Sequence, residues 1–374
     1  MTTDISRRGF ARILGASVAY TTLVQTVTHA TPVIRLVSKA SPDVETVRLS
    51  SNENPYGPSP AALRAMTDSF GLAWRYPDGH AENLNENLAK LHSVSSEQIL
   101  LGNGSGELLK LAAAAFTNSS KPLVVAEPTF EAIARHARTA GAEVLRVNLD
   151  ANYAHNLDGM LTAATETGLI YICNPNNPTA SLTSKDAMRA FLAKVSERTI
   201  VLVDEAYHHY VDSADYESVI PLVKQYPNLI VARTFSKIYG MAGLRCGYCV
   251  TSSTLIQRMR AHQTWDSVNI MALVAAQASI RDREQVEQGR RRNDEVRKYV
   301  YSQLDKSGMK YVPSHANFLM IDVRRDVRSI ISTLRGRQVE VGRQFPALPN
   351  FLRVTIGTRP QMETFVAALK RVAA

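Results

Sequence analysis

The sequence contains few cysteines and no long hydrophobic run. Only three cysteines occur among 374 residues, so the chain is not a disulfide scaffold. The apolar stretch at residues 13–27 is diluted by Ala, Ser and Thr, whereas a stable membrane-spanning helix needs about 20 predominantly apolar residues. Repeats, low-complexity tracts and long Gly/Ser linkers are also absent. With 45% apolar and 21% charged residues, the composition predicts a globular protein without a stable membrane span.

Clustered positive charge is also scarce, although the chain has 43 basic and 34 acidic residues and a formal net charge of +9. Outside the N-terminus the only dense basic tract is Arg290-Arg291-Arg292, which lies among Glu and Asp residues. A nucleic-acid-binding surface is expected to cluster Lys and Arg with exposed aromatic residues. The pattern therefore favours a mildly basic, solvated surface and no nucleic-acid partner.

The first thirty residues are typical of a targeting segment. Adjacent Arg7 and Arg8 precede Phe10, a modest apolar stretch follows, and Ala30 is a small residue at which cleavage can occur. This pattern predicts a twin-arginine signal over residues 1–30, recognised by the twin-arginine export machinery, and hence a periplasmic or exported protein. The alternative is a basic amphipathic helix that stays on a cytoplasmic protein.

The remainder predicts an α/β fold, a three-layer sandwich with a mostly parallel sheet. Short apolar runs indicate buried strands at residues 123–126, 169–173, 200–203, 229–232 and 247–250. Segments with helical periodicity separate most of them, as at 108–116, 129–140 and 184–195. Such alternation is typical of a parallel sheet that is covered on both faces.

A smaller α+β domain is expected after the large one. Residues 252–308 look mostly helical and charged, and strands are expected near 317–322, 338–341 and 351–356. The predicted division is a signal at 1–30, an N-terminal arm with part of the small domain at 31–70, a large domain at 71–265 and a small domain at 266–374.

Polar motifs follow the predicted strands, where ligands bind in open α/β sheets. Residues 102–107 form a Gly-rich turn before a helix, which either presents backbone N–H groups to an anion or is a flexible turn capped by Ser105. Residues 174–179 combine asparagines with prolines, and residues 204–207 place two acids after an apolar strand. Lys237 and Arg245 flank a glycine-bearing loop.

The order of these motifs resembles that of fold-type I pyridoxal-phosphate aminotransferases, over nearly the whole chain after residue 45. The sequence is most similar to the histidinol-phosphate aminotransferase branch. The segments that carry the resemblance are residues 52–55, 75–78, 102–107, 174–179, 204–207, 236–237, 243–245 and 351–353.

The resemblance implies roles for residues around the cofactor ring. Lys237 would hold the aldehyde as a Schiff base and move the substrate proton. Asp204 would pair with the ring nitrogen, with the adjacent Glu205 as its rival. Asn177 and Tyr207 would donate to the ring oxygen. Phe130, where the family commonly has Tyr, would stack on the ring.

Phosphate contacts are implied for a second set of residues, which are Ser105, Gly106, Glu107, Ser236 and Arg245. The first three would donate backbone N–H groups, although the family often has Asp at the place of Gly106. Ser236 would supply a hydroxyl and Arg245 a guanidinium. Tyr76 would reach the phosphate in the neighbouring subunit, which implies a homodimer.

Substrate contacts are implied for Arg353, a guanidinium fork for a carboxylate, and for Asn174. Arg343 would meet the substrate side group, or else is a surface charge, and Asn54 and Tyr56 would approach from the arm. We expect no metal site. His208 and His209 lack further ligands at a suitable spacing, and the sulfurs of Cys246 and Cys249 would point to opposite faces of a strand.

The expected reaction is transamination between histidinol phosphate, or a similar amino donor, and 2-oxoglutarate. An exported relative that acts on aromatic or other amino acids is an alternative, as is a decarboxylase, racemase or C–S lyase on the same scaffold. A non-catalytic binding protein is disfavoured by the intact set of Lys237, Asp204 and Arg245.

Overall fold

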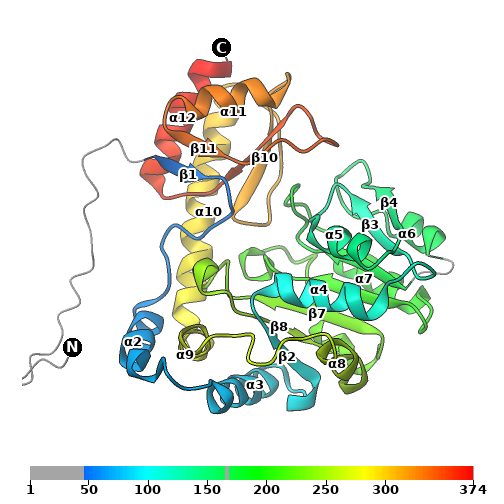
Figure 1. The fold of residues 1–374 in the computed structure, drawn as a ribbon. Coiled ribbons are helices and arrows are strands. Elements are labelled where there is room, and N and C mark those ends of the chain that lie inside the picture. Colours follow the sequence, from blue (N-terminus) through cyan, green and yellow to red (C-terminus); the bar gives the residue numbers. More distant parts are fainter. Residues whose placement is uncertain (1–45, 165–167, 374) are drawn as a thin grey trace, which may run out of the picture. The chain divides into compact units, whose positions relative to one another are not determined.

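A seven-stranded sheet is the largest element of the computed structural model, which describes residues 46–164 and 168–373 (Figure 1). The strand order is β2-β8-β7-β6-β5-β3-β4, and β8 alone runs against the others in this sheet. The strands are β2 (Ile99–Gly102), β3 (Leu123–Glu127), β4 (Val144–Asn148), β5 (Leu169–Cys173), β6 (Ile200–Asp204), β7 (Leu229–Thr234) and β8 (Gly247–Val250). The predicted α/β fold with a mostly parallel sheet is confirmed.

Helices cover both faces of this sheet, because its central strands are apolar at successive positions. Every residue of β5, β6 and β7 is buried. Side chains on one face pack with α4 (Ser105–Phe116), α5 (Ala132–Thr139) and α8 (Ser253–Arg260). Those on the other face pack with α3 (Asp78–His92), α6 (Leu157–Ala163), α7 (Lys185–Lys194) and α9 (Ile270–Ser279). Burial on both sides thus explains the continuous hydrophobic runs.

A third hydrophobic cluster lies mostly in the C-terminal part. An antiparallel sheet with the order β12-β10-β9 packs there with a parallel pair, β1 and β11. The strands are β1 (Val47–Leu49), β9 (Tyr311–Val312), β10 (Phe318–Asp322), β11 (Val339–Val341) and β12 (Phe351–Thr355). The helices are α10 (Arg283–Lys306), α11 (Val327–Arg335) and α12 (Arg359–Ala373).

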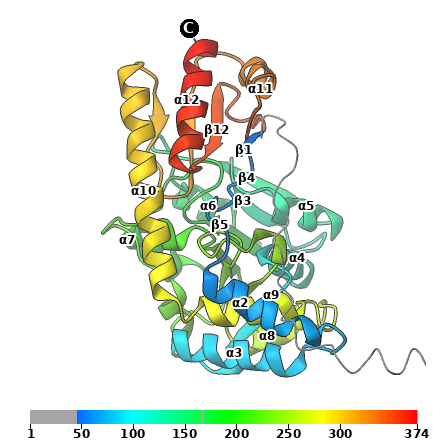
Figure 2. The same cartoon turned by 90° about the vertical axis from the view of Figure 1, so that its left-hand side faces the viewer.

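Two segments link the large sheet with its helices to the C-terminal part. The arm after β1 runs from beside β11 to α2 (Pro60–Ser69), which packs on α9 (Figure 1). The long α10 extends past both layers, with one part against α12 (Figure 2). At its other end Gln285 donates to the carbonyl of Tyr239, at 3.2 Å. The chain from Thr46 on forms one compact unit, so the domain boundaries at residues 70 and 265 stay predictions.

The predicted signal at residues 1–30 and the first part of the predicted arm lie outside the described residues. Among the residues that are described, none of the helices is long and apolar enough to cross a membrane.

Candidate functional site

Lys237 lies in the loop after β7, at the carboxyl edge of the large sheet. Its Nζ donates to the carbonyl oxygens of Asn52, at 3.0 Å, and Ser51, at 3.3 Å, both in the arm. Burial lowers the pKa of Lys237 to about 8, and the charges of Arg353 and Arg245 act in the same direction. A substantial fraction of this amine is therefore neutral near pH 8, the state in which an amine is nucleophilic.

Asp204 ends the neighbouring strand β6 and is almost fully buried. Its Oδ2 accepts a hydrogen bond from the hydroxyl of Tyr171, at 3.0 Å, and its Oδ1 accepts one from the backbone N–H of Ala206, at 3.1 Å. Burial raises the pKa of Asp204 to about 6, although these two hydrogen bonds oppose the rise. The carboxylate can hold a cationic N–H at this edge of the sheet.

Glu205, the alternative to Asp204, faces the opposite side of the sheet. Its Oε2 accepts from Nε of Arg233 at 2.8 Å, and its Oε1 accepts from the N–H of Val219 at 2.8 Å. Both charged side chains are buried. Because alternate residues of a strand point to opposite faces, Glu205 is committed to this ion pair while Asp204 stays on the side of Tyr171.

Tyr207 and Asn177 lie beside the lysine. The Tyr207 hydroxyl accepts from Nδ2 of Asn52 at 3.1 Å and from Nδ2 of Asn177 at 3.4 Å. Arg353, on β12, donates to Oδ1 of Asn177 at 2.9 Å and to the carbonyl of Ser50 at 2.8 Å. The third nitrogen of this arginine, Nε, is buried and has no hydrogen-bond partner among the described residues. These contacts bring the small sheet and the loops of the large sheet together around Lys237.

A cradle for an anion lies at the start of α4. Gly104 has φ +74°, and a Cβ there would lie 2.2 Å from a nitrogen of Arg245, so this glycine allows the guanidinium to approach. Ser105 and Gly106 begin α4, where unpaired N–H groups favour an anion. Arg245 also donates to the hydroxyl of Ser236, at 3.2 Å. The cradle thus combines helix N–H groups, a hydroxyl and a cation.

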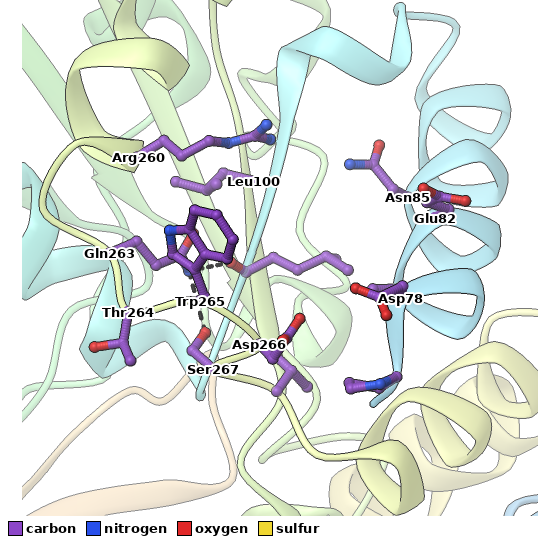
Figure 3. A pocket seen from close by; sticks show the side chains of 14 residues that line it. Asp78, Glu82, Asn85, Leu100, Arg260, Gln263, Thr264, Trp265, Asp266 and Ser267 are labelled. Atoms are coloured by element: carbon purple, nitrogen blue, oxygen red, sulfur yellow. Dashed lines mark hydrogen bonds between the residues drawn. The ribbon is translucent and has the colours of Figure 1, made fainter. Parts of the chain in front are cut away.

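The side chain of Glu107 holds the turn of the cradle in place by accepting hydrogen bonds from two segments. Its Oε2 accepts from the backbone N–H of Asn103 at 2.6 Å and from the hydroxyl of Ser267 at 2.8 Å. Gln263 donates to Ser267 at 3.2 Å in the same loop. Figure 3 shows this loop facing α3 across a cavity of about 380 Å³. Glu107 therefore ties the turn to the loop at residues 260–268.

Several predicted site residues lie at the surface. Tyr76 is 81% exposed and Phe130 is 38% exposed. Arg343 is also exposed, forms an ion pair with Glu131 at 2.6 Å and stacks on Phe345. Tyr56 stacks with Arg292. None of these side chains forms a described hydrogen bond or ring contact with Lys237 or Asp204.

Two predicted substrate residues are engaged within the protein. Asn174 accepts from the N–H of Thr183 at 3.0 Å and donates to the carbonyl of the same residue at 2.9 Å. Asn54 donates to the carbonyl of Ile238 at 2.8 Å. Their amides hold loops in place, and substrate contacts by them stay predictions.

The pair His208–His209 and the two cysteines of the C-x-x-C segment form no metal site with other described residues. His208 contacts the hydroxyl of Tyr216, and burial lowers the pKa of His209 to about 3. Cys246 and Cys249 belong to different hydrophobic clusters. Within the described part of the chain, no group of three His, Cys, Asp or Glu residues could hold a metal ion.

Two residues of the site had escaped the sequence analysis. Asn52 has a positive φ of 55° and bonds Tyr207 and Lys237, but its motif drew attention to Asn54 instead. Tyr171 lies within the apolar run at residues 169–173, to which the sequence assigns only a buried strand. The alternation of the strand could have identified Tyr171. Cys173 pairs with Asp204 in the sheet, so Tyr171, two residues earlier, lies on the same face as Asp204.

The donor set fits the pyridoxal phosphate that the sequence implies. The cradle suits a phosphate group, Asp204 suits a protonated ring nitrogen, and Lys237 offers an amine for the aldehyde. The glycine at 104 allows the guanidinium of Arg245 to approach the start of α4, and Nε of Arg353, which has no partner among the described residues, offers a donor to an anionic substrate.

Comparisons with known proteins agree with this chemistry. The family model for aminotransferase class I and II matches residues 44–369. The histidinol-phosphate aminotransferase of Moorella thermoacetica is 40% identical over 334 residues, which are 88% of this chain and 86% of that protein. That of Bacillus licheniformis is 39% identical over 86% of this chain and 90% of its own length. The crystal structure of histidinol-phosphate aminotransferase from Sinorhizobium meliloti with pyridoxal-5'-phosphate has a TM-score of 0.83 and 25% identity, covering 93% of this chain and 98% of that one.

Proposed function

As a member of the aminotransferase class I and II family, the chain is a pyridoxal-phosphate-dependent aminotransferase, and we propose that it moves the amino group of histidinol phosphate to 2-oxoglutarate. The observation that carries the choice of donor is the 40% identity to a histidinol-phosphate aminotransferase over 88% of this chain. The acceptor follows from the resemblance noted in the sequence.

Two arginines beside one aromatic ring support a phosphate-bearing donor. The guanidinium of Arg343 lies 4.4 Å from the centroid of Phe345, and that of Arg353 lies 5.2 Å from the same centroid. Two guanidinium groups near one point favour a dianion, since each can bind phosphate oxygens in a bidentate manner. We propose that Arg353 and Arg343 hold the anionic end of either substrate in turn.

The remaining residues act on protons and on orientation. Bound pyridoxal phosphate supplies an electron sink for the charge that develops at the substrate Cα. Neutral Lys237 takes the proton from Cα at its Nζ. Asp204 holds the proton of the ring nitrogen, and Tyr207 orients the ring by donating its hydroxyl proton. Phe130, which is 38% exposed, is proposed to pack on the ring because an aromatic side chain favours stacking.

A screen of amino donors tests the substrate. We expect the absorbance of the cofactor-loaded protein to change when histidinol phosphate is added, and to return when 2-oxoglutarate follows. Histidinol without phosphate is the matched control and should react with a KM at least about tenfold higher, since it loses charged hydrogen bonds. The assignment is overturned if histidinol phosphate leaves the spectrum unchanged while aromatic amino acids alter it. Release of CO₂ would instead indicate a decarboxylase.

We also propose a homodimer in which Tyr76 completes the site of the second copy. Tyr76, Trp74 and Trp265 are 81%, 72% and 92% exposed, and Tyr76 and Trp265 line one cavity of about 870 Å³. Such large exposed aromatic side chains favour a protein interface. The loop of Trp265 is tied to the cradle through Ser267 and Glu107.

Hybrid dimers test this sharing. A Tyr76→Ala chain combined with a Lys237→Ala chain should regain one intact site, because each site takes these two residues from different copies. Tyr76→Ala alone should weaken cofactor binding by about 10–100-fold, as for a lost hydrogen bond to a charged group. A hybrid of Lys237→Ala and Asp204→Ala is the control without recovery, since both residues come from one copy. Equal activity of the two hybrids would contradict the proposal.

Export through a twin-arginine signal is proposed from residues 1–30 alone. Fractionation of cells that express the full chain should place a shortened protein in the periplasm. The variant with both Arg7→Lys and Arg8→Lys should stay in the cytoplasm at full length. A full-length cytoplasmic protein would refute export.

A further inference from the structure

The arm residue Asn52 forms hydrogen bonds near Lys237 through both its main chain and its side chain. It is 1% exposed, and its φ of 55° is in the left-handed region that Asn tolerates better than most residues. Its backbone N–H donates to the hydroxyl of Thr355 on β12 at 2.9 Å. Its carbonyl accepts from Lys237 at 3.0 Å and from Nδ2 of Asn317 at 3.1 Å. One residue thus joins the arm, the small sheet and the lysine loop.

The Thr355 hydroxyl sets the orientation of the Asn52 amide. This hydroxyl accepts from the Asn52 N–H, so its own proton is free to be donated to Oδ1 of Asn52, at 3.4 Å. With Oδ1 turned to Thr355, Nδ2 faces the hydroxyl of Tyr207, at 3.1 Å. The amide is therefore a donor toward Tyr207.

The hydroxyl of Tyr207 has only one proton to donate and two acceptor positions. Asn52 and Asn177 both donate to it. With its acceptor positions filled, the proton of Tyr207 is left for another acceptor. An arrangement of this kind makes a hydroxyl a committed donor, which is the state needed to bind an anionic oxygen.

We propose that Asn52 is a positioning residue, which commits Tyr207 to donate toward the cofactor and whose main-chain carbonyl holds the amine of Lys237. This inference rests on the proposed roles of Lys237 and Tyr207. Donation by Tyr207 stabilises negative charge on the cofactor oxygen. It therefore favours the form of the cofactor-loaded protein in which Nζ of Lys237 is deprotonated.

Other charged groups around Lys237 define the background of a titration. They are Arg353 on β12, Arg245 before β8, Glu53 in the arm and Asp204 on β6, with the Tyr207 ring 5.5 Å from Nζ. None of them is removed when Asn52 is changed, so a shift reports the contact between Asn52 and Tyr207.

The variant Asn52→Gly removes the amide side chain but keeps the carbonyl, and glycine adopts a positive φ without strain. We expect the pKa read from the absorbance of the substrate-free, cofactor-loaded protein to rise by about 0.5–1 unit, since the loss of a hydrogen bond has about that size. The dissociation constant of the cofactor should rise by about 3–10-fold. In the Tyr207→Phe background the same change should have no further effect on the pKa.

Two further variants sharpen the test. Pro55→Gly loosens the same arm by freeing its φ and should leave this pKa unchanged. Asn52→Asp keeps the shape but offers a carboxylate, which accepts the hydrogen bond of the Tyr207 hydroxyl. The pKa read from the absorbance should therefore rise more in this variant than in Asn52→Gly.

The proposal is overturned if Asn52→Gly and Asn52→Asp both leave the pKa unchanged, or if Asn52→Gly shifts it equally with Phe at position 207. Either result would leave Asn52 a structural residue of the arm while the proposed function stands. A wild-type protein that forms no cofactor absorbance band would instead refute the proposed function, and with it this inference.

Discussion

Lys237→Ala is expected to lower kcat by at least about 10⁴-fold, because general acid–base catalysis alone contributes about 10²–10⁴-fold and this variant also loses the amine that binds the cofactor. Among the described residues, no other lysine lies between the arm carbonyls and Tyr207. Rapid mixing of the loaded protein with amino donor measures the effect in a single turnover.

Lys90→Ala is the control for this result, since the Lys90 side chain is exposed and its Nζ lies 4.0 Å from the carboxylate of Glu86 on the same helix, α3. We expect its kcat to stay within about twofold of wild type, as for a surface change. Full turnover by Lys237→Ala would show that another group moves the proton, and would remove the basis of the proposed reaction.

The same lysine predicts how cofactor capture depends on pH. Its pKa of about 8 lies below the ordinary value of 10.5 because the amine is buried near two arginines. Only the neutral amine reacts with an aldehyde. In protein freed of cofactor, the capture rate should rise about tenfold per pH unit below pH 8 and level off above it. A plateau reached only near pH 10 would contradict the lowered pKa.

Asp204→Ala is the second large effect, with an expected loss in kcat of about 10²–10³-fold, the size seen when one charge-stabilising group is removed from an active site. Loss of this carboxylate should not, however, lower the stability of the fold. The folded pKa of Asp204, about 6, lies above the ordinary 3.8, so the buried charge destabilises the fold at pH 7. In cofactor-free protein we therefore expect Asp204→Asn to be at least as stable as wild type. The difference should vanish as the pH falls through 6 to below 3.8.

Glu205→Gln is the matched variant one residue away. It leaves buried Arg233 without its carboxylate, so we expect a loss of about 3–5 kcal/mol in the free energy of unfolding. Turnover per folded molecule should fall far less than in Asp204→Ala. Urea unfolding and single-turnover rates separate the two effects. If Glu205→Gln were the variant with lost turnover and unchanged stability, the assignment of the two acids would be reversed.

The stretches of sequence that carried the fold were those whose burial is uniform. Strands β5, β6 and β7 are buried at every position. Such strands are continuous apolar runs, which can be recognised in the sequence without knowing what packs against them. The motifs could be placed for a related reason. Since the carboxyl ends of parallel strands meet at one edge, the segments that follow β5, β6 and β7 had to lie near each other.

Other features depended on contacts between distant residues. Asn52 meets Lys237 across 185 positions, and nothing in the local pattern distinguishes its side chain from that of Asn54. Tyr171 reads as one more apolar residue of β5 until its hydroxyl is seen to meet Asp204. Glu107 was predicted as a phosphate contact through its backbone, whereas its side chain holds the loop at Ser267.

The local sequence was sufficient for the parallel sheet, because hydrophobic periodicity involves residues close together in the chain. The order of the motifs along the chain indicated the family, and the resemblance to that family implied the amine, the acid and the anion cradle. The partners of those residues were decided by the folded chain. Strand alternation turns Glu205 toward Arg233 and leaves Asp204 with Tyr171. The arm returns to place Asn52 against Tyr207 and Lys237. A hydrogen bond requires two groups within about 3 Å, and only the path of the whole chain brings these groups that close.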